Sequence, residues 1–207
     1  RLAPNDPYPA GLDDIWQGYL WIVNYAEKVL GVKSDKVIVV GDSAGGNLAL
    51  ALSLRLIRAG LPPPHACLLF YPALLVDMHS SSPSIFASLD DTVLSPSLLK
   101  YCVKAYVGED EFRNLEDPFI SPLSGSNELL EKLPPMRIVV GSKDPFHDDS
   151  WRLLAKMRKL NKDVKLIVHE HFRHGFLNHP ALKNYHLYME EACNLIRELA
   201  LLEKESA

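Results

Sequence analysis

Hydrophobic residues are arranged along this chain in two distinct patterns. Four short apolar runs, rich in β-branched or aromatic residues, carry no more than one Lys or Arg each. Nearly continuous apolar runs of this length are typical of strands that are buried on both faces of a parallel sheet. We therefore predict strands at residues 37–40, 66–71, 136–141 and 164–169.

The segments around these runs repeat apolar residues every three or four positions, which is the period of one helix face. Helices are predicted from Asp13 or Asp14 to Gly31, from Leu48 to about Gly60, from Ser95 or Ser97 to Gly108, from about Asp148 to Leu160, and from about Pro180 to Leu202. Parallel strands joined by helices need right-handed crossovers. The predicted fold class is α/β, with a mostly parallel sheet covered by helices on both faces.

The composition fits one globular domain with a sizeable core. The 207 residues are 47% hydrophobic and 23% charged, with a net charge of −4. This charge gives no basic surface for nucleic acid, and no apolar run reaches the roughly 18 residues of a membrane-spanning helix. Residues 1–207 are therefore interpreted as a single domain that neither binds nucleic acid nor crosses a membrane.

Three cysteines, Cys67, Cys102 and Cys193, lie far apart in apolar surroundings. Their odd number and wide spacing favour buried free thiols over disulfides or metal ligands. Free thiols are typical of a reducing compartment, so the sequence predicts a cytoplasmic protein.

A long insertion, at about residues 73–135, breaks the alternation of strands and helices. Insertions of this length at the carboxyl edge of a sheet commonly form lids or substrate-binding caps. We expect a cap-like segment here; the alternative is a packing excursion that does not contact substrate.

The sequence Gly41-Asp42-Ser43-Ala44-Gly45 joins the first strand to an apolar helix. Gly41 and Gly45 stand two positions either side of Ser43, where side chains are expected to collide across a sharp turn. Such a nucleophile elbow would expose Ser43 Oγ above the sheet and direct the Ala44 N–H at an oxyanion. The alternative is an ordinary junction in which Ser43 caps the helix.

Two polar residues that follow later strands could activate Ser43. Asp144 follows the third strand and His174 the fourth. A serine hydroxyl needs a base, imidazole can take its proton and return it to a leaving alkoxide, and a carboxylate can orient the imidazole. Asp148 and Asp149 compete with Asp144, but they occupy positions where a helix N-terminus favours acidic residues.

The choice of histidine rests on the loop after the fourth strand. Gly175 lets this loop turn close to the elbow, and Phe176 can anchor it in the core, which favours His174. The competing histidines are His169, His171 and His179. No spacing of histidines and acids resembles a metal site.

Together these motifs resemble the hormone-sensitive lipase family of α/β-hydrolases, and the eukaryotic hormone-sensitive lipases in particular. The matching segments are Arg1–Pro4, Gly41–Asn47, Tyr71–Pro72, Asp117–Leu123, Leu133–Pro135, Asp144–Pro145, Asp148–Asp149 and His174–Leu177. The resemblance implies an α/β-hydrolase fold and a serine esterase or lipase that hydrolyses lipid, aryl or short-to-medium acyl esters through an acyl-enzyme. It implies no cofactor, and it leaves contact with a lipid surface open.

The chain departs from the family pattern in two places. Asn5 stands where the family usually has glutamate, and the His-Gly-Gly-Gly motif that supplies further oxyanion donors is absent. We expect that motif, and the strands beside the elbow strand, before Arg1. The chain is accordingly interpreted as the C-terminal catalytic part of a longer protein, with N-terminal strands missing.

Other functions remain open at this point. A non-catalytic ligand-binding protein on the same scaffold is one alternative, although the presence of Ser43, Asp144 and His174 argues against it. An inactive truncated fragment is another, suggested by the abrupt start at Arg1. An amidase or deacetylase would use the same three residues.

Overall fold

The computed structural model describes residues 1–76, 82–91, 93–108, 115–183 and 185–203. The strands are β1 (Ile38–Asp42), β2 (Ala66–Phe70), β3 (Met136–Gly141) and β4 (Val164–His169). The α-helices are α1 (Ala10–Leu30), α2 (Ala44–Arg58), α3 (Pro83–Ala87), α4 (Pro96–Val107), α5 (Asn127–Leu130), α6 (His147–Lys159) and α7 (Tyr185–Leu201). Two 3₁₀ turns are η1 (Pro122–Ser124) and η2 (Phe176–Asn178).

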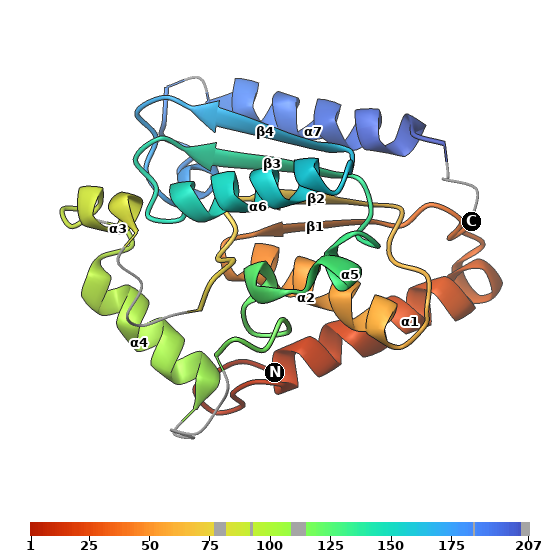
Figure 1. The fold of residues 1–207 in the computed structure, drawn as a ribbon. Helices are drawn as coiled ribbons and strands as arrows, with labels where there is room; N and C mark the ends of the chain where they lie inside the picture. The colour runs from red at the N-terminus through yellow and green to blue at the C-terminus, as the bar shows by residue number, and fades with distance from the viewer. Residues whose placement is uncertain (77–81, 92, 109–114, 184, 204–207) are drawn as a thin grey trace.

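The strands form one parallel sheet in the order β1-β2-β3-β4, so each strand pairs with its neighbour in sequence (Figure 1). Asp42 at the end of β1 is in register with Phe70, and Gly141 at the end of β3 with His169. Because all strands run in one direction, their carboxyl ends form one edge of the sheet. The segments that follow β1, β3 and β4 therefore start along that edge.

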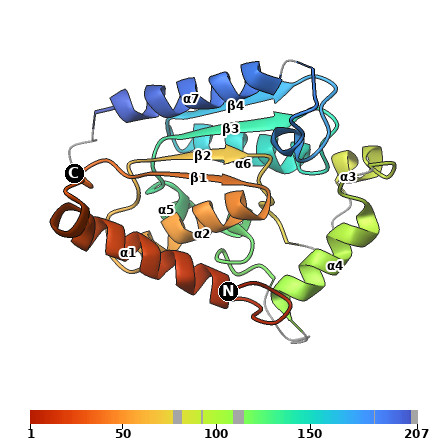
Figure 2. The same ribbon diagram turned by 180° about the vertical axis from the view of Figure 1, so that it is seen from behind.

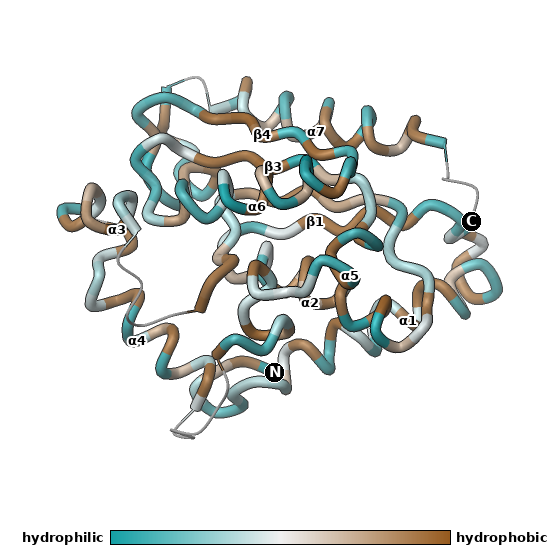
Figure 3. The backbone as a smooth tube through the Cα atoms, in the orientation of Figure 1, coloured by the Kyte–Doolittle hydropathy of each residue, from teal (hydrophilic) through white to brown (hydrophobic). Residues whose placement is uncertain are grey.

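Helices cover both faces of the sheet, as the sequence predicts (Figures 1 and 2). On one face, α2 and α6 pack against the strands, with a core that includes Ala49, Leu50, Leu54, Cys67, Leu69, Met136, Ile138, Leu153, Leu154 and Met157. On the other face, α7 packs against Ala66, Leu68, Phe70 and Val139 through Ala192, Leu195 and Leu199. Side chains alternate between faces along a strand, so β2 contributes to both cores and is wholly buried. Figure 3 shows that β3 and β4 are largely hydrophobic, as expected for strands between two layers of helices.

Helix α1 begins at Ala10, earlier than the predicted capping residues Asp13 and Asp14. Both acids lie inside the helix and bind arginines instead. Asp13 accepts a hydrogen bond from Arg55 at 2.6 Å, and Asp14 binds Arg1. Gly31 ends the helix, as predicted, and its φ of 67° is typical of a left-handed C-cap.

Strand β1 is less buried than its apolar sequence predicts. It lies at an edge of the sheet formed by the described residues, and Val40 is 47% exposed. The apolar repeats that predicted α1 and α7 are also only partly buried, because Val29, Met189 and Ile196 are exposed. An apolar repeat gives the period of a helix, but only the packing partner decides which side of the repeat is covered.

The 73–135 insertion carries α3, α4, η1 and α5. Helix α3 lies at the carboxyl edge of the sheet, and α4 continues from it along the side of the molecule (Figure 1). Leu123 of η1 and Leu130 of α5 belong to the core shared with α2 and α6. The insertion is thus divided between a part at the carboxyl edge and a part built into the main core.

A buried arginine connects the amino ends of β3 and β4 with the last turn of α7. The Arg137 side chain is 2% exposed and donates hydrogen bonds to Asp163 at 2.9 and 3.2 Å and to Glu198 at 3.1 and 2.8 Å. Burial by itself lowers the pKa of the Arg137 guanidinium, but these two carboxylates outweigh it and raise the pKa. The arginine therefore stays charged inside the fold.

The two sides of this ion pair are expected to respond unequally to substitution. Asp163→Asn leaves a buried guanidinium short of negative charge, which should lower the free energy of unfolding by about 3 kcal/mol. Arg137→Met should lower it by less, since Asp163 and Glu198 are 40% and 37% exposed and can be solvated. Urea unfolding of both variants measures the difference, and an equal or larger loss in Arg137→Met would contradict it.

Candidate active site

Three polar residues from separate segments meet at the carboxyl edge of the sheet. Ser43 Oγ lies 2.8 Å from His174 Nε2, and His174 Nδ1 lies 2.9 Å from Asp144 Oδ2. Ser43 follows β1, Asp144 follows β3 and His174 lies in the loop after β4. Asp144 is fully buried and His174 nearly so, whereas Ser43 is only half-buried. The Ser43 hydroxyl is therefore accessible from solvent, and the Asp144 carboxylate lies deepest in the protein.

The direction of the hydrogen bonds follows from the chemistry of the end groups. A carboxylate can only accept, so the proton between Asp144 and His174 is carried by Nδ1. Nε2 is then the ring nitrogen with a free lone pair, and it accepts from the Ser43 hydroxyl. Asp144 Oδ1 meanwhile accepts from the Phe146 N–H at 2.8 Å, which fixes the carboxylate in its own loop.

Ser43 has a backbone conformation that ordinary residues avoid, with φ 52° and ψ −118°. Strain of this kind is typical of functional turns. Gly41 makes the turn possible, because a Cβ there would lie 2.2 Å from the Gly45 carbonyl oxygen. The same steric need predicted for Gly45 is wrong, since a Cβ on Gly45 would meet Asp42 at an ordinary 3.8 Å.

Helix α2 begins at Ala44, directly after the strained serine. The first N–H groups of a helix have no partner within it and point out of its N-terminus. Ala44 carries the first of these N–H groups and directly follows Ser43. Asn47, on the first turn of α2, fixes the start of the helix by donating to the Ala73 and Ile120 carbonyls at 2.8 Å each.

Aromatic rings and a glycine hold the His174 loop. The Tyr71 and Phe146 rings stand edge-on to the imidazole, with centroids 4.9 and 5.1 Å away. Gly175 takes a φ of 71°, and Phe176 is buried in the core beneath α7, as the sequence predicts. The imidazole plane is thereby fixed by packing as well as by its two hydrogen bonds.

Gly141 is a positioning residue that the sequence interpretation missed. Its Cα passes close to the His174 loop, and a Cβ there would lie 2.2 Å from the Phe172 carbonyl oxygen. The available signal was a glycine that ends an otherwise fully buried strand, which often marks a close backbone approach.

Gly141→Ala is expected to damage activity more than stability. The added methyl must displace the Phe172 backbone, which costs about 1–3 kcal/mol as overpacking. Because His174 lies two residues after Phe172, this displacement should also move the imidazole. A shift of about 1 Å in the imidazole should lower kcat/KM about 10²-fold. Gly18→Ala is the control, since nothing lies within 4 Å of its added Cβ. Thermal unfolding and kcat/KM of the two variants test this, and equal activities would contradict it.

The competing acids and histidines lie outside this hydrogen-bonded path, and His179 is exposed. Asp148 and Asp149 lie in the first turn of α6, as expected, where Asp149 pairs with Arg152 at 3.0 Å. His169 lies in β4 and pairs with Glu191 at 2.8 Å. His171 is exposed and has a positive φ of 69°.

A cavity of about 590 Å³ lies beside His174. Most of its surface is apolar, from Val93, Phe172, Phe176, Ala181 and Leu182, and its polar lining residues are His171, Arg173, His174 and His179. Among the described residues of the 73–135 insertion, Val93 alone lines this cavity. Other apolar residues of that insertion lie elsewhere: Leu74 is in the main core, and Phe86, Leu89 and Leu98 are exposed.

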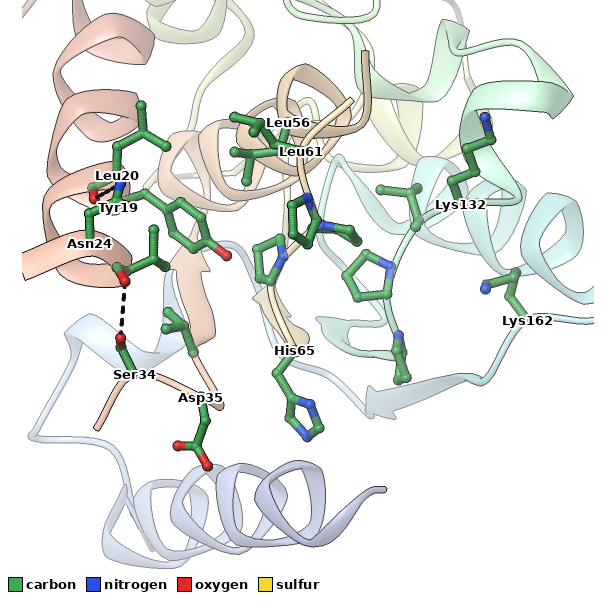
Figure 4. Close-up of a pocket in the computed structure, with 18 of the residues that line it drawn as sticks. Tyr19, Leu20, Asn24, Ser34, Asp35, Leu56, Leu61, His65, Lys132 and Lys162 are labelled. Atoms are coloured by element: carbon green, nitrogen blue, oxygen red, sulfur yellow. Dashed lines mark hydrogen bonds between the residues drawn. The ribbon is translucent and has the colours of Figure 1, made fainter. Parts of the chain in front are cut away.

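A larger cavity, of about 760 Å³, lies away from these three residues and contains Ser34, Asp35 and His65 in its lining (Figure 4). A serine, an aspartate and a histidine could form a second path like that of Ser43, His174 and Asp144. The hydrogen bonds of Ser34 and His65, however, go to backbone carbonyls. Ser34 Oγ donates to the Val23 carbonyl at 3.4 Å, and His65 Nε2 donates to the Leu199 carbonyl at 3.1 Å. The hydrogen-bonded path from Ser43 through His174 to Asp144 thus lies beside the smaller cavity, which His174 lines.

The described residues contain no group of three or more His, Cys, Asp or Glu side chains that could hold a metal ion. Within the same residues, no helix is both long and apolar enough to span a membrane. All three cysteines are free, but only Cys67 is buried, so the predicted burial of Cys102 and Cys193 is wrong. Both lie on the outward sides of their helices, α4 and α7.

Comparisons with known proteins identify relatives with the same fold. A family model described as alpha/beta hydrolase fold matches residues 1–178. Esterase LipI of Mycobacterium tuberculosis is 32% identical over 182 residues, which cover 88% of this chain and 55% of that protein. The hormone-sensitive lipase of Mus musculus is 39% identical over 114 residues, covering 54% of this chain and 15% of the lipase.

A solved structure extends the match to three dimensions. The hyperthermophilic esterase from the archaeon Pyrobaculum calidifontis superposes with a TM-score of 0.88 at 25% identity, covering 98% of this chain and 63% of that one. The chain thus spans little more than half the length of LipI. The family match over residues 1–178 and the named relatives agree with the sequence motifs, and the chain belongs to the hormone-sensitive lipase family of α/β-hydrolases.

Proposed function

We propose that the protein is a serine hydrolase that cleaves carboxylic esters through an acyl-enzyme on Ser43. The observation that carries this proposal is the continuous hydrogen-bonded path from Ser43 Oγ through His174 to Asp144, at 2.8 and 2.9 Å. Relatives described as esterases and lipases support the same reaction class.

In the first half of the reaction, Ser43 Oγ attacks the ester carbonyl carbon while His174 Nε2 takes the hydroxyl proton. The carbonyl electrons move onto oxygen, where the Ala44 N–H can donate a hydrogen bond. The carbonyl then re-forms, the alkoxide leaves, and His174 returns the proton to it. Asp144 keeps the imidazole oriented and stabilises its charged form.

In the second half, water replaces the alcohol. His174 Nε2 takes a proton from water, the resulting nucleophile attacks the acyl-enzyme, and the proton returns to Ser43 Oγ as the carboxylic acid leaves. Both halves use one oxyanion donor from this chain, the Ala44 N–H.

The substrate is proposed to be an ester with an apolar part, such as a lipid or a short-to-medium acyl ester. The cavity beside His174 supports this class, since Phe172, Phe176 and Leu182 offer an apolar surface within reach of the imidazole. Burial of each methylene in such a surface contributes about 0.8 kcal/mol. We propose a cytoplasmic location, which the free thiols of Cys102 and Cys193 support; a secreted form with these cysteines paired would contradict it.

A non-catalytic binding protein is the main alternative function. Such a protein has no need of a strained serine turn, a defined imidazole tautomer or a buried carboxylate behind it. The presence of all three favours catalysis. An amidase would use the same residues, so the choice between ester and amide substrates is left to experiment.

The test uses the natural protein that contains these residues. It should hydrolyse p-nitrophenyl butyrate, and a fluorophosphonate should abolish this activity by labelling one serine per chain. Mass spectrometry of the labelled peptide should identify Ser43. A folded natural protein that neither hydrolyses p-nitrophenyl esters nor reacts with the fluorophosphonate would favour the binding protein.

A further inference from the structure

Two serines of the 82–91 segment bind the backbone of the loop that carries Asp144. Ser84 Oγ donates to the Pro145 carbonyl at 2.8 Å. Ser88 Oγ donates to the Ser84 carbonyl at 2.7 Å and also lies 3.1 Å from the Lys143 carbonyl oxygen, so its single proton is shared between the two carbonyls. Both serines are buried. The residues on each side of Asp144 are therefore held from outside their own loop.

A further contact reaches the helix that follows this loop. The Ser84 N–H donates to Asp148 Oδ2 at 2.8 Å, and the Asp148 N–H lies 3.4 Å from Ser84 Oγ. Ser84 thus makes reciprocal hydrogen bonds with the first turn of α6. These contacts occupy Asp148, the carboxylate that competed with Asp144 in the sequence.

The other end of the segment binds the loop that carries His174. Asp90 accepts two hydrogen bonds from the Arg173 guanidinium, at 3.2 and 3.1 Å. Asp91 Oδ2 lies 3.9 Å from Arg173 Nη1. A bidentate pair fixes orientation as well as distance. Because Arg173 immediately precedes His174, this contact restrains the backbone from which the imidazole extends.

Asp91 is itself held in a fixed position, although its Oδ2 has no hydrogen-bond partner in the described part of the chain. Its side chain has no exposed surface, and its Oδ1 accepts the N–H groups of Val93 and Leu94 at 2.7 and 2.9 Å. Its own N–H donates to the Ser88 carbonyl at 2.9 Å. The backbone of the segment thus connects Ser88, which lies beside the Asp144 loop, directly with Asp91, which lies beside Arg173.

We propose that residues 82–91 form a positioning brace for the Asp144–His174 pair. The brace holds the Asp144 loop through Ser84 and Ser88, and it holds the His174 loop through Arg173. This inference rests on the proposed esterase function. It gives the carboxyl-edge part of the insertion a role in aligning the proton relay, beyond any contact with substrate.

The brace acts through position, because none of its groups contacts a reacting atom. The relay needs two hydrogen bonds of 2.8 and 2.9 Å between residues on three separate loops. A displacement of about 1 Å in such an arrangement commonly lowers the rate about 10²-fold. A segment that binds both the acid loop and the histidine loop limits their relative movement.

Arg173→Gln in the natural protein tests the histidine side of the brace. We expect kcat for p-nitrophenyl butyrate at saturating concentration to fall about 10- to 100-fold. Arg173 also lines the cavity beside His174, so KM is expected to change as well. The downfield NMR resonance of the His174 Nδ1 proton should shift and broaden. Arg173→Lys should restore part of kcat, since it keeps the charge but loses the bidentate fork.

Arg55→Gln is the matched control. Arg55 is 30% exposed and ion-paired to Asp13, compared with 35% exposure for Arg173, but it connects α1 and α2. It should change stability without changing kcat or the His174 resonance. Ser84→Ala tests the acid side, and it should lower kcat and move the same resonance. Adding Asp90→Asn to Arg173→Gln should lower kcat by less than twofold further.

An unchanged kcat or an unchanged His174 resonance in folded Arg173→Gln would overturn the brace. If that variant does not fold, Asp90→Asn provides the same comparison with a smaller change. Failure of the proposed function is distinguishable: a wild-type protein that hydrolyses no ester would refute the esterase, while the NMR resonance would still report whether Arg173 and Ser84 position His174.

Discussion

Replacing Ser43 with alanine is expected to lower kcat about a millionfold, by analogy with removal of the nucleophile from other catalytic triads. The physical reason is that Ser43 Oγ is the hydroxyl held 2.8 Å from the imidazole nitrogen that accepts its proton. The alanine variant keeps the fold, because a smaller side chain fits the same strained turn. KM should therefore change little, and the loss should appear in kcat under saturating ester.

The serine at the other cavity provides a control for this experiment. Ser34→Ala removes a hydroxyl bonded only weakly to the Val23 carbonyl, at 3.4 Å, and should leave kcat unchanged. Fluorophosphonate labelling should persist in Ser34→Ala and disappear in Ser43→Ala. Labelling that remains after the Ser43 substitution would refute the assignment of the nucleophile.

Replacing His174 with alanine is expected to be as damaging as the serine substitution, because either change leaves the relay without a proton transfer. Asp144→Asn should lower kcat about 10⁴-fold, since an amide can donate to Nδ1 and favour the wrong tautomer. Both variants should still bind ester, so the effect should again lie in kcat. Stopped assays with p-nitrophenyl butyrate at saturating concentration measure kcat of Ser43→Ala, His174→Ala and Asp144→Asn.

His171→Ala is the informative control, because His171 lies in the same loop and competed with His174 in the sequence. Its side chain is exposed, and its backbone N–H donates to Ser142 Oγ at 2.9 Å, a bond that alanine retains. We expect less than a tenfold loss of kcat. An inactive His171→Ala with an active His174→Ala would mean that the base lies three residues earlier than the geometry indicates.

The local pattern of the chain predicted most of the secondary structure. Four apolar runs became β1 to β4, and the fully buried runs at 66–70 and 136–141 became the two central strands. The left-handed Gly31 and Gly175 were also predictable, because positive φ is a property of the residue and its immediate neighbours. The elbow had a strong signal, since strand, glycine, serine and helix follow one another within a few residues.

Burial was less predictable, because it depends on what packs against a residue. The apolar repeats of α1 and α7 contain more hydrophobic positions than their partners cover, so Val29 and Ile196 are exposed. Gly45 looked as necessary as Gly41, yet only Gly41 faces backbone across the turn. Gly141 looked like a strand end, and its contact with Phe172 depends on a loop 31 residues later in the chain.

The sequence by itself determined the parallel strand–helix architecture, the strained position of Ser43 and the family to which the chain belongs. These follow from local conformational preference and from the order of motifs. The tertiary structure decided which acid and which histidine lie together, because Asp144, Asp148, His171 and His174 are chemically alike and differ only in where their loops place them. It also decided that Arg173 lies beside Asp90 and Asp91, since contacts between distant segments form only when the whole sheet brings its carboxyl edge together.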